Sequence, residues 1–150
     1  MKIYYREKSG GIEILRCFGI EGRVEIPGMI DDKLVISAAP YAFSSHMDEK
    51  EELKNASLWE VSDGLEFGRE EHVLAGNDVE EIVFPYTLKE IGRYIFYGCG
   101  NLKKLEFSDS LMQIGCGAFT GCHALEKLTV HMRQGKKSGV KEMLGEMWQR

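Results

Sequence analysis

The stretch IGRYIFYGC (residues 91–99) returns 23 residues later as IGCGAFTGC (residues 114–122). When residues 84–107 are aligned with residues 107–130, ten of the 24 aligned pairs are identical, far more than two unrelated segments would share. The same offset brings three segments of the form apolar-x-x-apolar-x-apolar into register, beginning at Val79, Leu102 and Leu125. The chain therefore carries an internal repeat with a period of 23 residues.

A 23-residue period built on the pattern L-x-x-L-x-L lies in the range of roughly 20–29 residues that leucine-rich repeats occupy. Alternate side chains of a strand face opposite sides, so Leu105 and Phe107 are expected inside and their neighbours outside. A single strand cannot bury its apolar edge alone, whereas stacked coils turn the repeated apolar positions into continuous ladders. The predicted fold is therefore α/β: a leucine-rich-repeat solenoid with short parallel strands, an N-terminal β-hairpin cap and a C-terminal helical cap.

The two repeated strings resemble the I-G-x-x-A-F-x-G-C hallmark of BspA-type leucine-rich repeats. The Phe84-Pro85 pair resembles the proline that ends the strand in that family. The resemblance implies a solenoid repeat protein, and the family is best known among bacterial surface and adhesion proteins. Its motif is specific for the fold and poorly specific for the function.

A further copy of the repeat is predicted near the N-terminus. Residues 24–27 (VEIP) match residues 82–85 (IVFP). Ile36 followed by Phe43 is matched with Ile91 followed by Phe96, although the spacing differs and Ser44-Ser45 replaces the Gly-Cys pair.

A degenerate copy is predicted directly before residue 79. Residues 56–61 (ASLWEV) keep the strand pattern in register without a gap, and Leu65 and Val73 fall at the places of Leu88 and Phe96. We therefore expect residues 56–78 to form the coil that precedes the regular repeats.

The whole chain, residues 1–150, is predicted to be a single leucine-rich-repeat domain. Its predicted parts are an N-terminal cap (1–19), divergent repeats with a helical insertion near 46–55 (20–78), regular 23-residue repeats (79–130) and a C-terminal capping helix (131–150). Residues 2–6 and 11–18 flank the turn Lys8-Ser9-Gly10-Gly11 and are expected to pair as the hairpin of the N-terminal cap.

Two segments outside the repeats are predicted to be helical. Residues 46–55 are polar, with Ser45 as a candidate N-cap, and we interpret them as an insertion on the solvent side; an acidic docking site is the alternative. The C-terminal segment carries an amphipathic apolar stripe made of Val140, Met143, Leu144, Met147 and Trp148. We expect this segment to cover the last coil; a partner or self-association helix and a membrane-surface helix are the alternatives.

The composition argues against several classes of function. The net charge of −5, from 19 basic and 24 acidic residues, argues against a protein that binds nucleic acid. No apolar run approaches the roughly 18 residues of a membrane span, and the charged first eight residues are unlike a secretory signal. We therefore expect a cytoplasmic protein whose four cysteines are free thiols.

No arrangement of residues predicts catalysis, a metal site or a cofactor. The sequence has no G-x-S-x-G, H-E-x-x-H or P-loop motif, and no spacing that would position an acid–base pair. A possible zinc site is disfavoured because its candidate ligands lack a tight C-x2-C spacing: Cys116, Cys122, His123 and His131. A disulfide between Cys99 and Cys122 is disfavoured because equivalent positions of a parallel stack point their Cβ atoms the same way.

Alternation along the predicted strands places one row of side chains per coil on an outward stripe. The candidate binding residues on this stripe are Glu60, Glu81, Val83, Lys104, Glu106, Lys127, Thr129 and His131, with Ser62 and Ser108 beside them. We expect a non-enzymatic module that recognises a protein partner through the stripe. One alternative is a structural protein that self-associates through the stack end or the C-terminal helix, and another is a merely solvated face.

Overall fold

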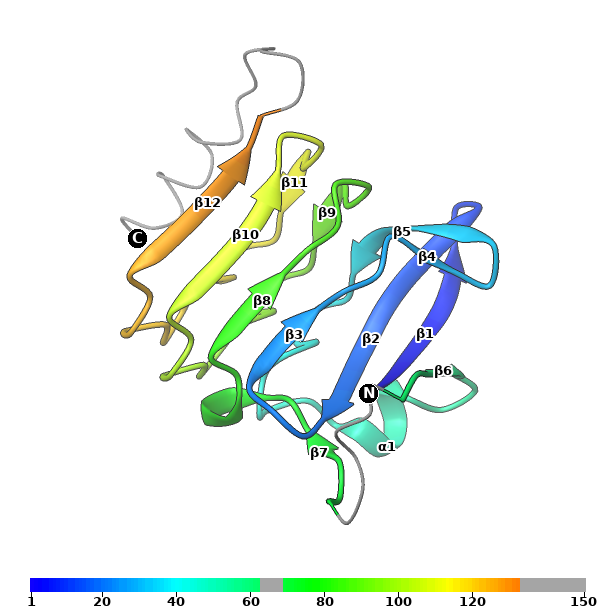
Figure 1. Ribbon diagram of the computed structural model, residues 1–150, viewed down its shortest axis with the longest axis horizontal. Coiled ribbons are helices and arrows are strands. Elements are labelled where there is room, and N and C mark those ends of the chain that lie inside the picture. Colours follow the sequence, from blue (N-terminus) through cyan, green and yellow to red (C-terminus); the bar gives the residue numbers. More distant parts are fainter. Residues whose placement is uncertain (63–68, 133–150) are drawn as a thin grey trace.

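The apolar-x-x-apolar-x-apolar segments become neighbouring strands of one parallel sheet, which we call the repeat sheet. The computed structural model describes residues 1–62 and 69–132, and the repeat sheet has the strand order β12-β10-β8-β3 (Figure 1). Its strands are β3 (Arg23–Glu25), β8 (Glu81–Val83), β10 (Lys104–Ser108) and β12 (Lys127–His131). Leu105 lies opposite Ile82 on one side and Leu128 on the other, so the repeated apolar positions form the predicted ladder.

A second sheet forms the other side of the coils, with the strand order β11-β9-β5-β2-β1-β6 and with β4 beside β5 and β7 beside β2. Its strands are β1 (Lys2–Lys8), β2 (Gly11–Gly19), β4 (Met29–Ile30), β5 (Lys33–Ala38), β6 (Ser57–Glu60), β7 (His72–Val73), β9 (Glu90–Ile91) and β11 (Gln113–Ile114). The predicted hairpin is present, because β1 and β2 pair antiparallel. Since β2 also pairs parallel with β5, the hairpin extends the second sheet beyond the first coil.

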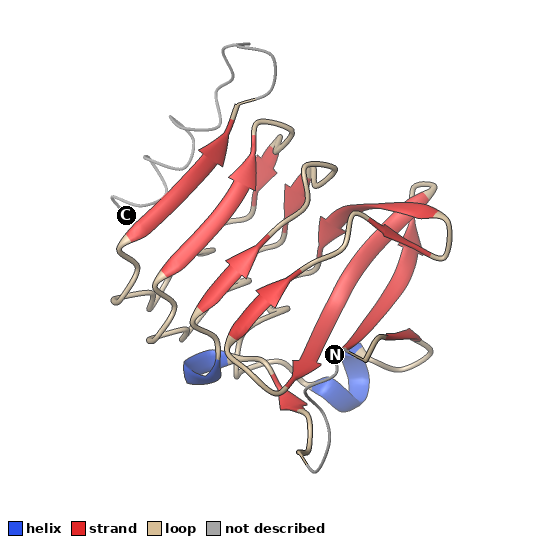
Figure 2. Ribbon diagram, in the orientation of Figure 1, coloured by secondary structure: helices blue, strands red, loops and turns tan. Residues whose placement is uncertain are grey.

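The described residues contain almost no helix (Figure 2). In residues 1–62 and 69–132, the one α-helix is α1 (Glu49–Glu52), and a single 3₁₀ turn, η1, spans Gly76–Asp78. The expected α/β class is therefore corrected to a β-solenoid of the leucine-rich-repeat type. Each 23-residue coil passes from its second-sheet strand into a tight turn, where Gly98 and Gly121 have φ values of +78° and +84°. Glycine reaches this left-handed region without steric cost, and such a turn leaves no room for a helix.

The turns of successive coils stack through backbone hydrogen bonds. The N–H of Phe43 donates to the carbonyl of Ile95 at 3.0 Å, and one coil later the N–H of Phe96 donates to the carbonyl of Ala118 at 3.2 Å. The rings of Phe43, Phe96 and Phe119 follow one another inside the stack, with centroids 6.1 and 5.6 Å apart. Each turn therefore gives its N–H groups to the next coil, and the carbonyls of the first turn need donors from elsewhere.

The first coil pairs with the regular repeats in a register that differs from the predicted one. Val24 lies opposite Ile82, as expected, but Ala38 rather than Ile36 lies opposite Ile91. The reason is the extra chain in the β4–β5 hairpin: 12 residues separate Ile26 from Ala38 where 7 separate Phe84 from Ile91. After Ala38 the spacing returns to that of the regular coils.

Residues 56–78 do not form the predicted coil. Their strand β6 pairs antiparallel with β1, with Trp59 opposite Ile3, and β7 pairs antiparallel with the end of β2. Leu65 lies outside the described residues. The N–H of Gly76 donates to the carbonyl of Phe43 at 2.8 Å, just as the N–H of Cys99 donates to that of Phe96 at 2.9 Å. The first coil is therefore completed by Gly76 directly after Ser45, and the residues between them are one insertion.

The helix within this insertion is shorter than predicted. Asp48, not Ser45, is the N-cap, because its side chain accepts from the N–H of Glu51 at 3.3 Å. The predicted C-terminal helix does not begin at residue 131, since His131 ends β12. The remainder of that prediction, including the apolar stripe that begins at Val140, lies outside the described residues.

Arg16 in β2 supplies the donors that the first turn lacks. Its side chain is only 2% exposed. Nη1 donates to the carbonyls of Tyr41 (3.1 Å), Ala42 (3.1 Å) and Ser44 (2.6 Å), and Nη2 lies 3.0 Å from a carboxylate oxygen of Glu49. Burial lowers the pKa of this guanidinium, and the bond to Glu49 opposes that shift. The buried Arg16 thus donates hydrogen bonds to carbonyls of the first turn, as the backbone N–H groups of a preceding coil would.

Candidate functional site

Two rows of side chains cross the outward side of the repeat sheet, one position per strand. The first row is Arg23, Glu81, Lys104 and Lys127, and the second is Glu25, Val83, Glu106 and Thr129. These rows alternate with the buried ladder that contains Leu105, so their outward direction follows from the strand pleat. We call these eight residues together with His131, which follows Thr129 on the same side of β12, the strand face.

The structure brings seven of the eight predicted binding residues together on the strand face: Glu81, Val83, Lys104, Glu106, Lys127, Thr129 and His131. Glu60 is a correction, because it lies in β6 opposite Lys2 of β1, in the second sheet. Ser62 follows β6 and is equally remote from the repeat sheet. Ser108 is also corrected: it is 4% exposed, and its hydroxyl donates to the carbonyl of Tyr86 at 3.3 Å.

Arg23 and Glu25 occupy the place on the strand face that Glu60 and Ser62 were expected to fill. The sequence match between residues 24–27 and 82–85 could have predicted this position. When the match is extended by one residue, it aligns Arg23 with Glu81, and it aligns Glu25 with Val83. The apolar-polar alternation of residues 56–61 fits the repeat pattern equally well, and it led to the choice of Glu60 and Ser62 instead. A period-2 apolar pattern fits any half-buried strand and does not say which strand will be its neighbour.

Most charges of the strand face are paired within the chain. Arg23 lies 3.2 Å from a carboxylate oxygen of Glu25 and 3.6 Å from one of Glu81, and the hydrogen bond to Glu25 raises the pKa of the guanidinium. His131 Nε2 lies 3.3 Å from Glu106 Oε2. Exposed pairs of this kind are worth about 0–1 kcal/mol each, so they orient the side chains more than they stabilise the fold.

Lys104 and Lys127 are the exception. They are directly opposite each other on β10 and β12, and both are exposed. Within the described ranges, neither lysine forms an ion pair with a carboxylate, although Glu81 flanks Lys104 on the next strand. Like charges in directly opposed positions are unfavourable in a sheet. The strand face thus carries a local excess of positive charge at the amino end of its strands.

A groove opens at the other end of the strand face, where the strands of the repeat sheet reach their carboxyl ends. Its volume is about 380 Å³, and we call it the carboxyl-end groove. Its lining combines the polar or charged residues Glu25, Glu106 and His131 with the apolar residues Val83 and Pro85 and the aromatic ring of Tyr86. Tyr86 is 61% exposed, the second most exposed large apolar side chain among the described residues.

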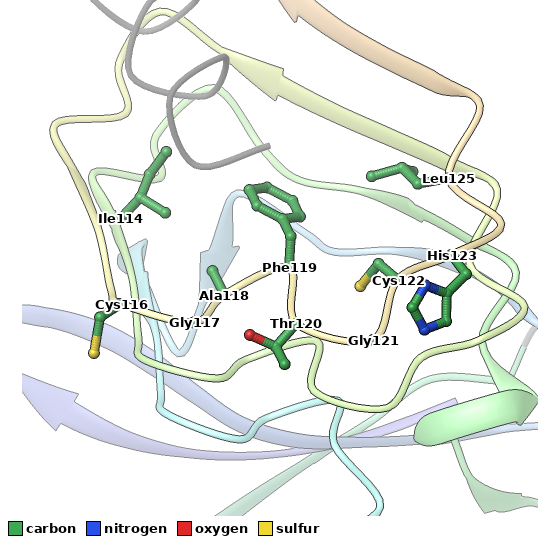
Figure 3. A pocket seen from close by; sticks show the side chains of 10 residues that line it. All are labelled: Ile114, Cys116, Gly117, Ala118, Phe119, Thr120, Gly121, Cys122, His123 and Leu125. Carbon is green, nitrogen blue, oxygen red and sulfur yellow. The ribbon is translucent and has the colours of Figure 1, made fainter. Parts of the chain in front are cut away.

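The last described coil encloses a second hollow, of about 670 Å³. Figure 3 shows Ile114, Phe119, Cys122 and Leu125 pointing into the interior of this coil, whereas Cys116 and Thr120 point away from it. Phe119 and Cys122 are only partly buried, although Phe96 and Cys99 at the same positions of the preceding coil are fully buried. In the preceding coil, Phe96 is contacted by Phe119 and Cys122 of the coil that follows it.

A third hollow, of about 550 Å³, lies on the second sheet and is lined by an ion-pair network. The buried carboxylate of Glu13 accepts from Lys8 Nζ at 3.0 Å and from the hydroxyl of Ser37 at 2.9 Å. Lys8 Nζ also donates to Glu90 at 2.6 Å, and this bond lowers the pKa of Glu90. Because these groups satisfy one another around the buried Glu13, we interpret the network as the means by which the β1–β2 hairpin attaches to the coils.

The repeated cysteine has a structural role. Cys99 Sγ donates to the carbonyl of Phe43 at 3.2 Å, and Cys122 Sγ to that of Phe96 at 3.3 Å, so each thiol binds the preceding coil. Burial raises the pKa of Cys17, Cys99 and Cys122 to about 12 in each case. All four cysteines are free in the structure, and only Cys116 is exposed.

We expect one fast-reacting thiol in the native protein and four after unfolding. At pH 8, Ellman's reagent should react at once with Cys116, because Cys17 and Cys99 are buried, Cys122 is partly buried, and burial raises the pKa of all three thiols. Adding denaturant without a reductant should then release the full count of four. A Cys116→Ser variant is the control and should show no fast phase. A total of two thiols, with a linked Cys99–Cys122 peptide in the mass spectrum, would contradict the prediction.

Comparison with known proteins places this geometry in a family. Residues 70–138 match the model of the BspA type leucine rich repeat region (6 copies). A leucine rich cell surface protein from Faecalibacterium prausnitzii A2-165 aligns over 86% of this chain and 30% of its own length, with 19% identity and a TM-score of 0.56. The Leucine Rich Repeat protein of T. pallidum aligns over 97% of this chain and 92% of its own, with 19% identity and a TM-score of 0.35. The pneumococcal vaccine antigen PcpA aligns over 91% and 38%, with 20% identity and a TM-score of 0.41.

The chain thus spans less than a third of the F. prausnitzii protein, and the likeness shows a shared fold. No curated protein sequence matches the chain. In the ranges 1–62 and 69–132, no helix is long and apolar enough to cross a membrane. The repeated strings, the parallel repeat sheet and the match over residues 70–138 agree, and this part of the chain matches the BspA-type leucine-rich repeat family.

Proposed function

We propose that this chain is a non-enzymatic recognition module that binds a protein partner through the strand face. The observation that carries the proposal is the pair Lys104 and Lys127, two opposed like charges that form no ion pair with a described carboxylate. Their mutual repulsion disfavours the folded chain slightly, so folding does not account for their placement. An anionic group of a partner would relieve that repulsion.

The setting of the two lysines also suits a binding surface. The strand β10, which carries Lys104, is paired with β12 along its whole length and with β8 along its first three residues, and β12, which carries Lys127, is paired with β10. The strand face is therefore rigid, and little conformational entropy would be lost when a partner binds. Because exposed cross-strand charge pairs contribute only about 0.2–1 kcal/mol each, its residues can vary without loss of the fold.

Reversing both lysine charges should weaken partner capture while leaving the fold intact. We expect the Lys104→Glu/Lys127→Glu variant, immobilised and exposed to extracts of its own organism, to retain its partner about tenfold less well than the parent protein. Its free energy of unfolding should stay within about 0.5 kcal/mol of the parent value, because both side chains are exposed. Quantitative mass spectrometry of the eluted proteins measures the first effect and urea denaturation the second.

The matched control is Lys54→Glu/Lys89→Glu, which changes the net charge equally at two exposed positions outside the strand face. It should capture the partner as the parent does. If no protein depends on the lysine pair, or if the control loses the same protein, the binding site does not lie on the strand face. A loss caused only by changes in residues 46–55 would move it to the insertion.

A second candidate function, assembly of copies through the end of the stack, is favoured by the last described coil. Phe119, Cys122, Leu128 and Val130 are only partly buried there, around the hollow of about 670 Å³. The competing hypothesis is the cover predicted from the sequence, in which the apolar stripe that begins at Val140 covers this end within one chain. Light scattering on the eluting protein distinguishes the two cases: a monomer supports the intramolecular cover, and a dimer that deletion of residues 136–150 converts to a monomer supports assembly.

We also propose that the protein works in the cytoplasm. Two of its four thiols, Cys99 and Cys122, serve as hydrogen-bond donors between coils rather than as disulfide partners. Protein thiols are kept in this reduced state by the cytosol, whereas oxidising compartments favour disulfides. The thiol count described above bears directly on this proposal.

A further inference from the structure

We infer that the carboxyl-end groove takes a basic side chain of the partner, an arginine by preference. The inference rests on the proposed function, because it completes the strand face as a bipolar surface: positive at the lysine pair and negative at the groove. The partner should therefore present a segment with two charged groups. An acidic group would bind Lys104 and Lys127, and a basic side chain would bind Glu25 and Glu106.

Two glutamates line this groove on either side of an apolar residue. Glu25 on β3 and Glu106 on β10 belong to the same row, and Val83 on β8 lies between them. Neighbouring strands lie about 4.8 Å apart, so the two carboxylate-bearing positions are separated by roughly 10 Å. A single cation that sits above Val83 can therefore approach both carboxylates.

Each carboxylate keeps one oxygen available. Glu25 Oε2 is paired with Arg23 and Glu106 Oε2 with His131. The Oε1 atom of each accepts no hydrogen bond from the described residues. The contacts with Arg23 and His131 orient the two carboxylates, and the remaining oxygens are acceptors for a donor from outside.

The groove suits arginine better than lysine. A guanidinium is planar and donates in several directions, so it can bridge two carboxylates, whereas an ammonium acts as a compact point charge. Its face can also stack on an aromatic ring, and Tyr86 closes the groove with a side chain that is 61% exposed. The methylene stem of the same side chain would cover Val83 and Pro85.

The probe for this site is N-acetyl-arginine amide, added to the ¹⁵N-labelled protein and followed by two-dimensional NMR. We expect saturable shifts at the backbone amides of Glu25, Val83, Tyr86 and Glu106, and no such shifts with N-acetyl-glutamine amide. Glu25→Gln and Glu106→Gln should each weaken the arginine probe roughly two- to fivefold, the range of a single exposed ion pair. The matched control, Glu126→Gln, removes an exposed carboxylate outside the groove and should leave the affinity unchanged.

The inference is overturned if these amides do not shift, if the glutamine probe shifts them equally, or if Glu25→Gln/Glu106→Gln binds arginine as well as the parent does. Its failure is separable from failure of the proposed function. Partner capture that depends on Lys104 and Lys127 but survives Glu25→Gln/Glu106→Gln would retain the strand face as the binding site and reject the arginine in the groove.

Discussion

Arg16→Met should lower the free energy of unfolding by roughly 3–5 kcal/mol, as expected when one partner of a buried charged network is removed. The methionine fills much of the same space but donates no hydrogen bonds. The carbonyls of Tyr41, Ala42 and Ser44 would then lose the donors that Nη1 supplies at 2.6–3.1 Å. The carbonyl of Tyr41 would keep the bond from the N–H of Ser44 at 2.9 Å. A buried carbonyl left without a donor costs about 1–3 kcal/mol, so the carbonyls of Ala42 and Ser44 account for most of the expected effect. Urea denaturation followed by circular dichroism measures it.

Two controls separate the carbonyl bonds from the ion pair. Glu49→Gln removes the charge that faces Arg16 but leaves the three carbonyl bonds in place. Since the Glu49 side chain is 39% exposed, this change should cost about 1 kcal/mol or less. Arg16→Lys keeps the positive charge, but its single ammonium cannot reach all four groups that the guanidinium contacts, the three carbonyls and Glu49. The free energy of unfolding of this variant should therefore lie between those of Arg16→Met and the parent. If Arg16→Met is no less stable than Glu49→Gln, Arg16 does not stabilise the first turn.

The second large effect is expected at Leu105, in the middle of the buried ladder. Leu105→Ala should destabilise the protein by about 2–5 kcal/mol, because a fully buried leucine is replaced by a cavity between two neighbouring coils. Lys104→Ala, one residue earlier on the same strand, should change stability by less than about 0.5 kcal/mol because its side chain is exposed. The same denaturation experiment measures both.

Leu128→Ala tests the position of Leu105 within the stack. Leu128 occupies the same place on the ladder one coil later but is only partly buried in the described residues. Its replacement should cost less than that of Leu105, because less apolar surface is covered there. Equal losses at the two positions would show that the end of the ladder is covered as fully as its middle.

The sequence by itself determined the repeat sheet and most of the strand face. The 23-residue period imposes the same local geometry on each coil, so equivalent residues must become neighbours when the coils stack. The opposition of Lys104 and Lys127, and of Leu105 and Leu128, could therefore be predicted without coordinates. The outward direction of Glu81 and Glu106 followed from strand alternation for the same reason.

Only the tertiary structure decided what happens where the repetition stops. The strand β6, which contains Trp59, has the apolar-polar alternation of a repeat strand. It nevertheless pairs with the edge of β1, so Glu60 lies in the second sheet and not on the strand face. The register of Ala38 depends on a hairpin whose extra length no repeat encodes. Arg16 has a role only because the first turn lacks a preceding coil. In each case the outcome depends on which distant segment satisfies an open backbone edge, and a local pattern of apolar and polar residues does not specify that partner.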